Sequence, residues 1–189
     1  MLITKNLSEN LKRKFIFVDN DFLSFTFRNP KSFKKIVGFL AENRLTLDSL
    51  TYFEFLRDSF LPETKKERQN FLMEGLFEKD KNLKTQVDKR QNNALHLSHI
   101  YAHNGKCKGV SYVDYMLGSL LMHHHREGVL VTGNKKDFPS ILFDTLGTLT
   151  FEDTKKHKPR IFWFLTFNKN KFYTCERNLS KVGGNFQLK

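Results

Sequence analysis

The stretch RKFIFVDNDFLSFTF, residues 13–27, decides the fold that the sequence predicts. It contains the short, bulky apolar run Phe15–Val18. Asp19, Asn20 and Asp21 end this run abruptly. A buried strand of a parallel sheet has this pattern, because both of its faces are covered and polar residues come only at its carboxyl end. We therefore expect a central strand at Phe15–Val18.

Outward from this strand, apolar runs alternate with helical patterns. Further strands are expected at residues 45–50 and 129–131. Helices are expected from Pro30 to about Asn43 and at residues 51–60. Residues 63–104 are expected to form two helices with a break near residues 80–82. A further helix is expected at residues 111–126, with Gly128 as its C-terminal cap. Strands that alternate with helices predict an α/β fold of three layers, with a central, mainly parallel sheet.

After Pro139 the pattern becomes richer in strands. Strands are expected at Phe143–Phe151, Arg160–Phe167 and residues 172–177, with a hairpin turn at 168–170. We expect residues 1–150 to form one α/β domain with a helical insert at 63–104. Residues 151–189 would form a β-rich C-terminal extension packed on that domain, ending in a loose tail at 183–185.

The charge of the chain favours a polyanionic partner. Its 189 residues carry 32 Lys and Arg against 20 Asp and Glu, a formal net charge of +12. Nucleic acid is the commonest partner of a basic protein of this kind. The two cysteines show no disulfide pattern, and no stretch is long and apolar enough to span a membrane, so we expect a cytoplasmic protein. Glycine-rich phosphate-binding motifs are missing from the sequence, which argues against a nucleotide-binding enzyme.

Acidic and amide residues occur where the expected strands end. Asp19 and Asp21 follow the first strand, and Asn134 and Asp137 follow residues 129–131. Ligands of open α/β sheets bind outside the carboxyl ends of the strands. Two more acids, Glu54 and Asp114, stand in apolar surroundings near the starts of expected helices, where a carboxylate is costly unless paired or bound to a cation. Hard oxygen ligands of this sort suit Mg²⁺ or Mn²⁺.

A structural interpretation of the same acids is equally open at this point. Ser111-x-x-Asp114 and Thr51-x-x-Glu54 both match the capping box of a helix N-terminus. Asp21 and Asp137 fit turn or cap positions. The residue pattern alone does not choose between helix capping and metal binding.

Four segments of the chain resemble the motifs of PIN-domain ribonucleases, in the order of that family. They are IFVDNDFLS at 16–24, LDSLTYFEFL at 47–56, GVSYVDYMLGSLL at 109–121 and VLVTGNKKDF at 129–138, and the match covers roughly residues 14–145. The resemblance implies a parallel sheet between helices and a metal-dependent endoribonuclease that cuts single-stranded or structured RNA.

The resemblance also implies roles for particular residues. Asp19, Glu54 and Asp114 would be the principal metal ligands, and Asp137 would hold a second metal or its waters. The supporting residues would be Thr132 and Asn134, which orient the cluster, and Asp21. The nearest group within the family is the VapC-like toxins, which implies a possible antitoxin partner and homodimer. The insert at 63–104 and the extension after Phe143 make this chain longer than a minimal toxin of that group.

Two groups of basic residues stand next to proposed site segments in the sequence. We expect them to position RNA: Lys12, Arg13, Lys14, Lys135 and Lys136. The run Lys155-Lys156-His157-Lys158 with Arg160 could grip phosphates, but a solvated loop beside a buried strand is the favoured interpretation. His96, His99 and His103 share one helical face, yet no carboxylate companion is evident in the sequence, so a core or surface role is favoured over zinc.

Two alternatives to the ribonuclease remain. The first is a catalytically silent PIN-like module that binds RNA or a protein. The second is a nuclease that acts on DNA with the same metal chemistry.

Overall fold

The computed structural model describes residues 1–57, 59, 61–73, 77–79, 87–152 and 159–182. Its strands are β1 (Leu2–Ile3), β2 (Phe15–Val18), β3 (Arg44–Leu47), β4 (Phe77–Lys79), β5 (Gly128–Thr132), β6 (Phe143–Phe151) and β7 (Arg160–Phe167). Its helices are α1 (Leu7–Leu11), α2 (Asn20–Arg28), α3 (Pro30–Phe39), α4 (Ser49–Arg57), α5 (Pro62–Met73), α6 (Val87–His103), α7 (Tyr112–His123) and α8 (Lys169–Val182), with a short 3-10 helix at Lys135–Asp137. The expected break near 80–82, the basic run at 155–158 and the tail at 183–185 lie outside the described residues.

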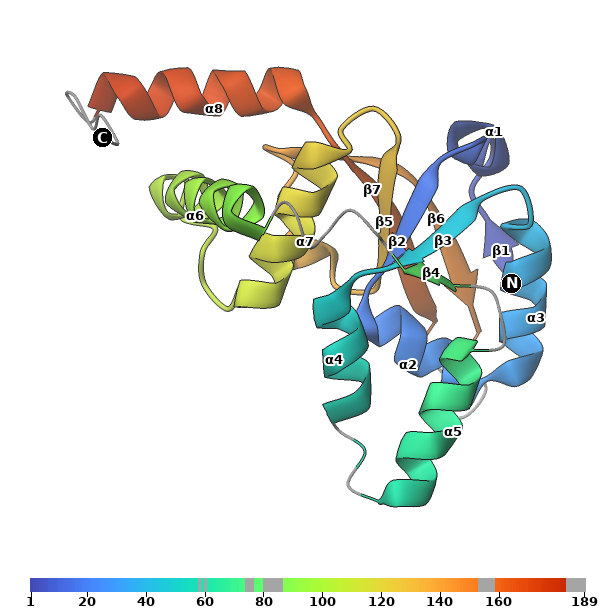
Figure 1. The fold of residues 1–189 in the computed structure, drawn as a ribbon. Helices are drawn as coiled ribbons and strands as arrows, with labels where there is room; N and C mark the ends of the chain where they lie inside the picture. The colour runs from blue at the N-terminus through green and yellow to red at the C-terminus, as the bar shows by residue number, and fades with distance from the viewer. Residues whose placement is uncertain (58, 60, 74–76, 80–86, 153–158, 183–189) are drawn as a thin grey trace.

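The described strands form one mixed sheet in the order β1-β6-β7-β5-β2-β3-β4 (Figure 1). The neighbours β4, β3, β2 and β5 are parallel, whereas β7, β6 and β1 add antiparallel pairs. The expectation of a mainly parallel sheet is therefore correct only for its centre. The connection between β6 and β7 is too short for the crossover that parallel pairing requires, so these two long strands pair as antiparallel neighbours.

Helices cover both faces of the sheet, which gives the expected three layers (Figure 1). Successive side chains of β2 point to opposite faces. Ile16 and Val18 lie in a core with Phe22 of α2, while Phe17 lies in a second core with Leu117 of α7. The alternation shows why Phe15–Val18 is apolar throughout. The strand predicted from sequence is confirmed at these residues.

The end of the chain differs from the prediction. Residues 172–177 were expected to be a strand and 168–170 a hairpin turn, and both predictions are wrong, because α8 spans Lys169–Val182. Phe172, Cys175 and Leu179 recur at helical spacing and pack on the core shared with α6 and α7. The Asn168 side chain accepts the Lys171 N–H at 3.0 Å, which is the contact of a helix N-cap.

Two other boundaries are set by packing that the sequence pattern did not show. The insert contains the two expected helices, α5 and α6, but the short strand β4 lies between them and pairs with β3. Gly128 begins β5 instead of capping α7, whose C-cap is His124. A Cβ at Gly128 would lie 3.0 Å from the His124 carbonyl oxygen, so glycine permits the close turn from helix to strand.

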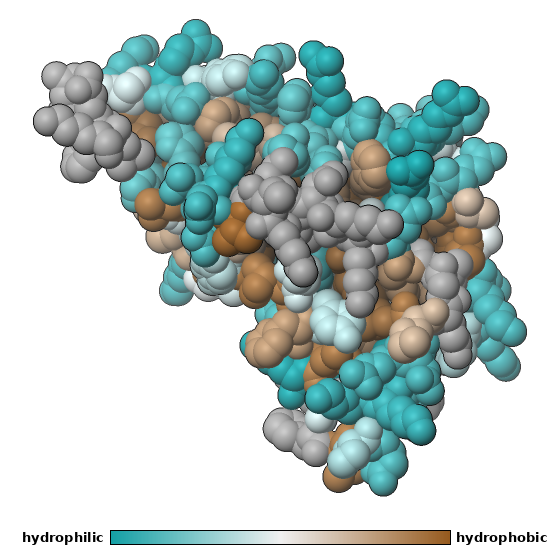
Figure 2. All heavy atoms as spheres, viewed as in Figure 1, coloured by the Kyte–Doolittle hydropathy of each residue, from teal (hydrophilic) through white to brown (hydrophobic). Residues whose placement is uncertain are grey.

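The visible surface is mainly hydrophilic. In Figure 2 hydrophilic side chains cover most of the visible face, with hydrophobic residues between them. Within the described part of the chain, no helix is both long and apolar enough to cross a membrane.

Candidate functional site

Three parallel strands end at one edge of the sheet and bring polar residues there. Asp19 follows β2, Asp48 follows β3, and Thr132 is the last residue of β5. Val18 pairs with Val131, and the Asp19 N–H donates to the Val131 carbonyl at 3.1 Å. Asp19 and Thr132 are therefore neighbours across the sheet, at the edge where ligands of such sheets bind.

A chain of hydrogen bonds joins Asp19 to Asp137. The Thr132 hydroxyl donates to Asp19 Oδ2 at 2.7 Å and accepts the Asn134 N–H at 2.9 Å. The Asn134 side-chain amide then donates to Asp137 Oδ2. Asp19, Thr132 and Asp137 are all buried. We call these four residues, Asp19, Thr132, Asn134 and Asp137, the acidic network.

Asp114 caps a helix and also acts on the acidic network. Its carboxylate accepts the Ser111 N–H at 2.8 Å while the Ser111 hydroxyl accepts the Asp114 N–H at 3.2 Å, so the predicted capping box of α7 is confirmed. The same carboxylate raises the pKa of Asp19 and of Asp137 through its negative charge. The Asp114 carboxylate can therefore cap α7 and still influence Asp19 and Asp137.

Burial and neighbouring carboxylates disfavour the ionised forms of Asp19 and Asp137. Burial, followed by the charges of Asp21 and Asp114, raises the pKa of Asp19 to about 7, although hydrogen bonds from Thr132 and Asn20 lower it. Burial and the charge of Asp114 also raise the pKa of Asp137, and Lys136 lowers it. A cation bound between these carboxylates would favour their ionised forms.

Asp21 lies beside the acidic network and is held by two donors. Its Oδ2 accepts the Gly133 N–H at 2.8 Å and lies 3.2 Å from Nη2 of Arg160. A Cβ at Gly133 would overlap this carboxylate oxygen, so glycine permits the approach. The other oxygen, Oδ1, is buried and has no hydrogen-bond partner among the described residues. Burial raises the pKa of Asp21, and the Arg160 charge lowers it.

The second structural alternative from the sequence, a capping box at Thr51-x-x-Glu54, is wrong. The helix α4 begins at Ser49, and Asp48 Oδ1 accepts the Leu50 N–H at 2.9 Å. Glu54 is half-buried in the second turn of α4, a helix that starts at the same edge of the sheet as α2. Its part in a metal site stays a prediction.

The sequence interpretation missed a buried ion pair at this edge. Asp48 Oδ2 lies 2.9 Å from Nη2 of Arg90, and both side chains are buried. The backbone carbonyl oxygen of Arg90 also accepts a hydrogen bond from the Ser119 hydroxyl at 2.8 Å. The pair therefore connects the end of β3 with the packed helices α6 and α7. The available signal was that Asp48 follows an apolar strand just as Asp19 does.

The structure separates the two groups of basic residues expected to position RNA. Lys135 and Lys136 lie in the 3-10 helix that contains Asp137. Lys12, Arg13 and Lys14 precede β2 and so lie at the opposite edge of the sheet from Asp19, with Lys14 donating to the Arg126 carbonyl oxygen. Proximity in sequence was misleading here, because the length of the strand separates its two ends.

The donor types fit a hard divalent cation, although the described side chains are not already arranged as a binding cage. Within the described ranges, no group of three or more His, Cys, Asp or Glu residues is placed to hold a metal ion. His96 lies with its Nε2 3.1 Å from Oε1 of Glu176 on α8, a carboxylate that the sequence did not associate with it. The carboxylate oxygens of Asp19 and Asp137 are the ligands that Mg²⁺ and Mn²⁺ prefer.

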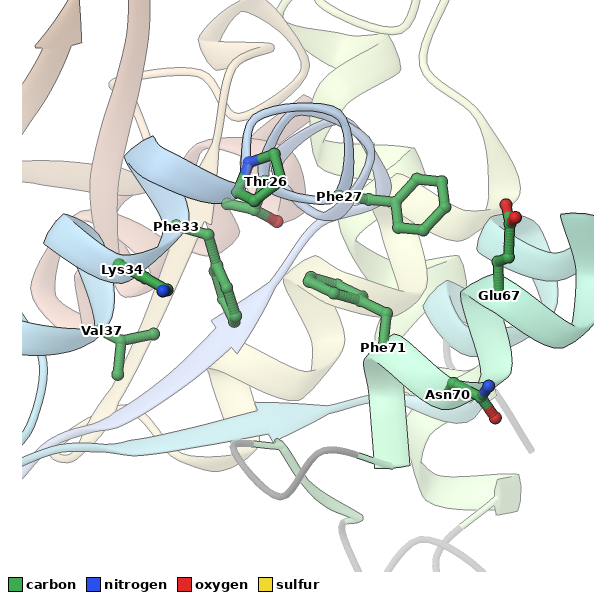
Figure 3. Close-up of a pocket in the computed structure, with 9 residues that line it drawn as sticks. Thr26, Phe27, Phe33, Lys34, Val37, Glu67, Asn70 and Phe71 are labelled. Atoms are coloured by element: carbon green, nitrogen blue, oxygen red, sulfur yellow. The ribbon is translucent and has the colours of Figure 1, made fainter.

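A hollow elsewhere on the molecule has a different chemistry. It encloses about 630 Å³ between α2, α3 and α5, and Figure 3 shows Phe27, Phe33 and Phe71 around it. Thr26 and Phe27 belong to the C-terminal part of α2, whereas Asp19 caps the N-terminus of that helix. The hollow is therefore separate from the acidic network.

No family model, no curated protein and no solved structure matches this chain.

Proposed function

We propose that this chain is a metal-dependent ribonuclease with a PIN-like site, in which Asp19, Asp114 and Asp137 bind Mg²⁺ or Mn²⁺, with Glu54 as a further ligand. One observation carries the proposal most directly. The hydrogen bonds from Asp19 through Thr132 and Asn134 to Asp137 connect acids from two parts of the chain at the carboxyl edge of the sheet. The charge of Asp114 acts on both ends of this network.

The residues of the network have separable tasks in the proposed reaction. Thr132 fixes the orientation of Asp19, and Asn134 fixes that of Asp137. A divalent cation, when bound, supplies the positive charge that activates water and stabilises the leaving oxygen of a phosphodiester. Lys135 and Lys136, next to Asp137, attract the phosphate backbone toward the acids.

RNA is the proposed substrate for two reasons. The net charge of +12 favours a polyanion over a neutral or acidic substrate. The sequence motifs resemble those of a family that cuts RNA, and each of the four acids of those motifs is present. Retention of all four favours a nuclease over a silent binding module.

A cleavage assay tests the proposal. Labelled single-stranded RNA, structured RNA and single-stranded DNA are incubated with the purified chain and with Mg²⁺, Mn²⁺ or a chelator. We expect RNA to be cut with either metal and to stay intact with the chelator. Binding of RNA without cleavage in both metals would instead identify a binding module, and cleavage confined to DNA would identify a DNA-directed nuclease.

A further inference from the structure

Arg160 reaches the same edge of the sheet as the acidic network, although it stands far from those residues in the sequence. It is the first residue of β7, which runs antiparallel to β5 with Trp163 opposite Thr132. Arg160 therefore extends past the carboxyl end of β5. Its Nη2 lies 3.2 Å from Asp21 Oδ2, and a Cβ at Gly133 would lie 3.0 Å from the same nitrogen.

The surroundings of Arg160 hold it in place without enclosing it. Its guanidinium lies over the Phe162 ring at 5.4 Å, and its side chain is 47% exposed, against 27% for Asp21. An ion pair as exposed as this adds little to the stability of a fold. A guanidinium has five N–H donors in a planar fork, and Asp21 takes one of them. Stability alone therefore does not account for an oriented cation at this edge.

We infer that Arg160 binds a backbone phosphate of the nucleic acid next to the acidic network, with Asp21, itself held by the Gly133 N–H, keeping its guanidinium in position. The inference rests on the proposed ribonuclease function and names a residue through which its substrate is held. Asp21, expected from the sequence as a supporting residue of the site, then acts as a positioning residue for Arg160.

The charges along the edge support this assignment. A polyanionic substrate is repelled by Asp19, Asp114 and Asp137 unless cations offset them. Lys135 and Lys136 supply positive charge at the Asp137 end of the network, and Arg160 supplies it beside Asp21, whose charge acts on Asp19. The planar fork of arginine matches the oxygens of a phosphate better than a lysine ammonium does.

Binding of RNA without cleavage tests the inference. The affinity of the chain for a labelled single-stranded RNA is measured by fluorescence anisotropy, with a chelator present, over a series of salt concentrations. A phosphate contact contributes about 0.7 to the slope of log affinity against log salt for a single strand. We expect Arg160→Ala to lower the slope by about 0.7 and to weaken binding about fivefold at about 0.1 M salt.

Arg44 provides a matched control. It is also an exposed arginine at the first residue of a strand, with its guanidinium 5.6 Å from a phenylalanine ring, that of Phe15. It lies at the opposite edge of the sheet, so Arg44→Ala removes the same charge away from the acids. Arg160→Lys keeps the charge but lacks the planar fork. We expect it to show the same salt slope as the unaltered chain and an affinity between those of the unaltered chain and Arg160→Ala.

The outcomes separate this inference from the proposed function. If the unaltered chain binds and cuts RNA while Arg160→Ala and Arg44→Ala match each other in affinity and slope, the Arg160 assignment is wrong and the nuclease stands. If the unaltered chain neither binds RNA in the chelator nor cuts it with Mg²⁺ or Mn²⁺, both are wrong. Thermal unfolding of each variant shows whether a loss of binding reflects a loss of folded protein. If Arg160→Ala unfolds, Arg160→Lys is used in its place. A slope of log affinity against log salt that is lower for Arg160→Lys than for the unaltered chain overturns the assignment.

Discussion

Asp19→Asn is expected to abolish RNA cleavage and at the same time to stabilise the metal-free protein at neutral pH. Asparagine keeps the size and one oxygen acceptor of the side chain but removes the charge that binds a cation. Loss of a metal that stabilises a transition state by several kcal/mol lowers the rate by about 10³-fold or more. The assay is the rate of RNA cleavage in Mn²⁺ at equal protein concentration.

The stability gain follows from the pKa of Asp19. In the folded chain it is raised from 3.8 to about 7, so the folded state binds more protons than the unfolded state between these values. The free energy of unfolding therefore falls as the pH rises from about 4 to about 7, by about 1.4 kcal/mol for each pKa unit of the shift. An asparagine side chain does not ionise, so Asp19→Asn removes this penalty. With a chelator present, we expect the variant to be more stable than the unaltered chain at pH 8 and the difference to shrink at pH 5.

Asp88 gives the control for this pair of effects. It is an acid in the first turn of α6 and is exposed, so Asp88→Asn removes a similar charge outside the acidic network. We expect Asp88→Asn to leave cleavage unchanged and to shift stability by no more than about 0.5 kcal/mol. An Asp19→Asn protein that folds and still cuts RNA at the unaltered rate would contradict the assignment of Asp19.

Arg90→Met is expected to lower the free energy of unfolding by about 3–5 kcal/mol, because it leaves a carboxylate buried without its partner. Asp48 is 1% exposed and lies 2.9 Å from Nη2 of Arg90 in the folded chain. For a chain of this size the loss corresponds to a fall of roughly 10 °C in the midpoint of thermal unfolding. Chemical denaturation with urea measures the free energy directly.

A double variant distinguishes a lost ion pair from lost packing. Asp48→Asn removes the stranded charge while its side-chain oxygen remains able to accept the Leu50 N–H at the start of α4. We expect Asp48→Asn with Arg90→Met to recover most of the stability lost in Arg90→Met alone. Arg177→Met, on the exposed side of α8, is the surface control. If Arg90→Met lowers the free energy of unfolding by less than about 1 kcal/mol, the Asp48–Arg90 pair does not stabilise the fold substantially.

The sequence predicted the centre of the fold because local pattern and tertiary position agree there. Phe15–Val18 and residues 129–131 are apolar on both faces, and both are buried parallel strands in the structure. The acids that follow them meet because parallel neighbours end at one edge. The pattern therefore placed Asp19, Asn134 and Asp137 at strand ends, whereas the role of Thr132 came from the resemblance and the pairing of β2 with β5 from the structure.

The parts that were not predicted depend on contacts between distant residues. The Asp48–Arg90 pair joins a strand end to a helix in the insert, and the Asp21–Arg160 pair joins α2 to β7. In both pairs, the positions of the two residues in the sequence do not indicate that they are in contact. The strand expected at 172–177 failed for a local reason, since Phe172 and Cys175 fit helical spacing as well as an aromatic strand, and packing against α6 and α7 favours the helix.

Titration of the metal-free protein with Mn²⁺ by calorimetry at pH 7 tests most directly whether these acids share a cation. We expect binding with release of protons, because Asp19, with its pKa near 7, is partly protonated before the metal binds. We also expect Asp19→Asn and Asp137→Asn each to weaken the binding by about 10–100-fold or more, while Asp88→Asn does not. Equal Mn²⁺ affinity in all four proteins, or no binding by the unaltered chain, would show that these acids do not share a cation.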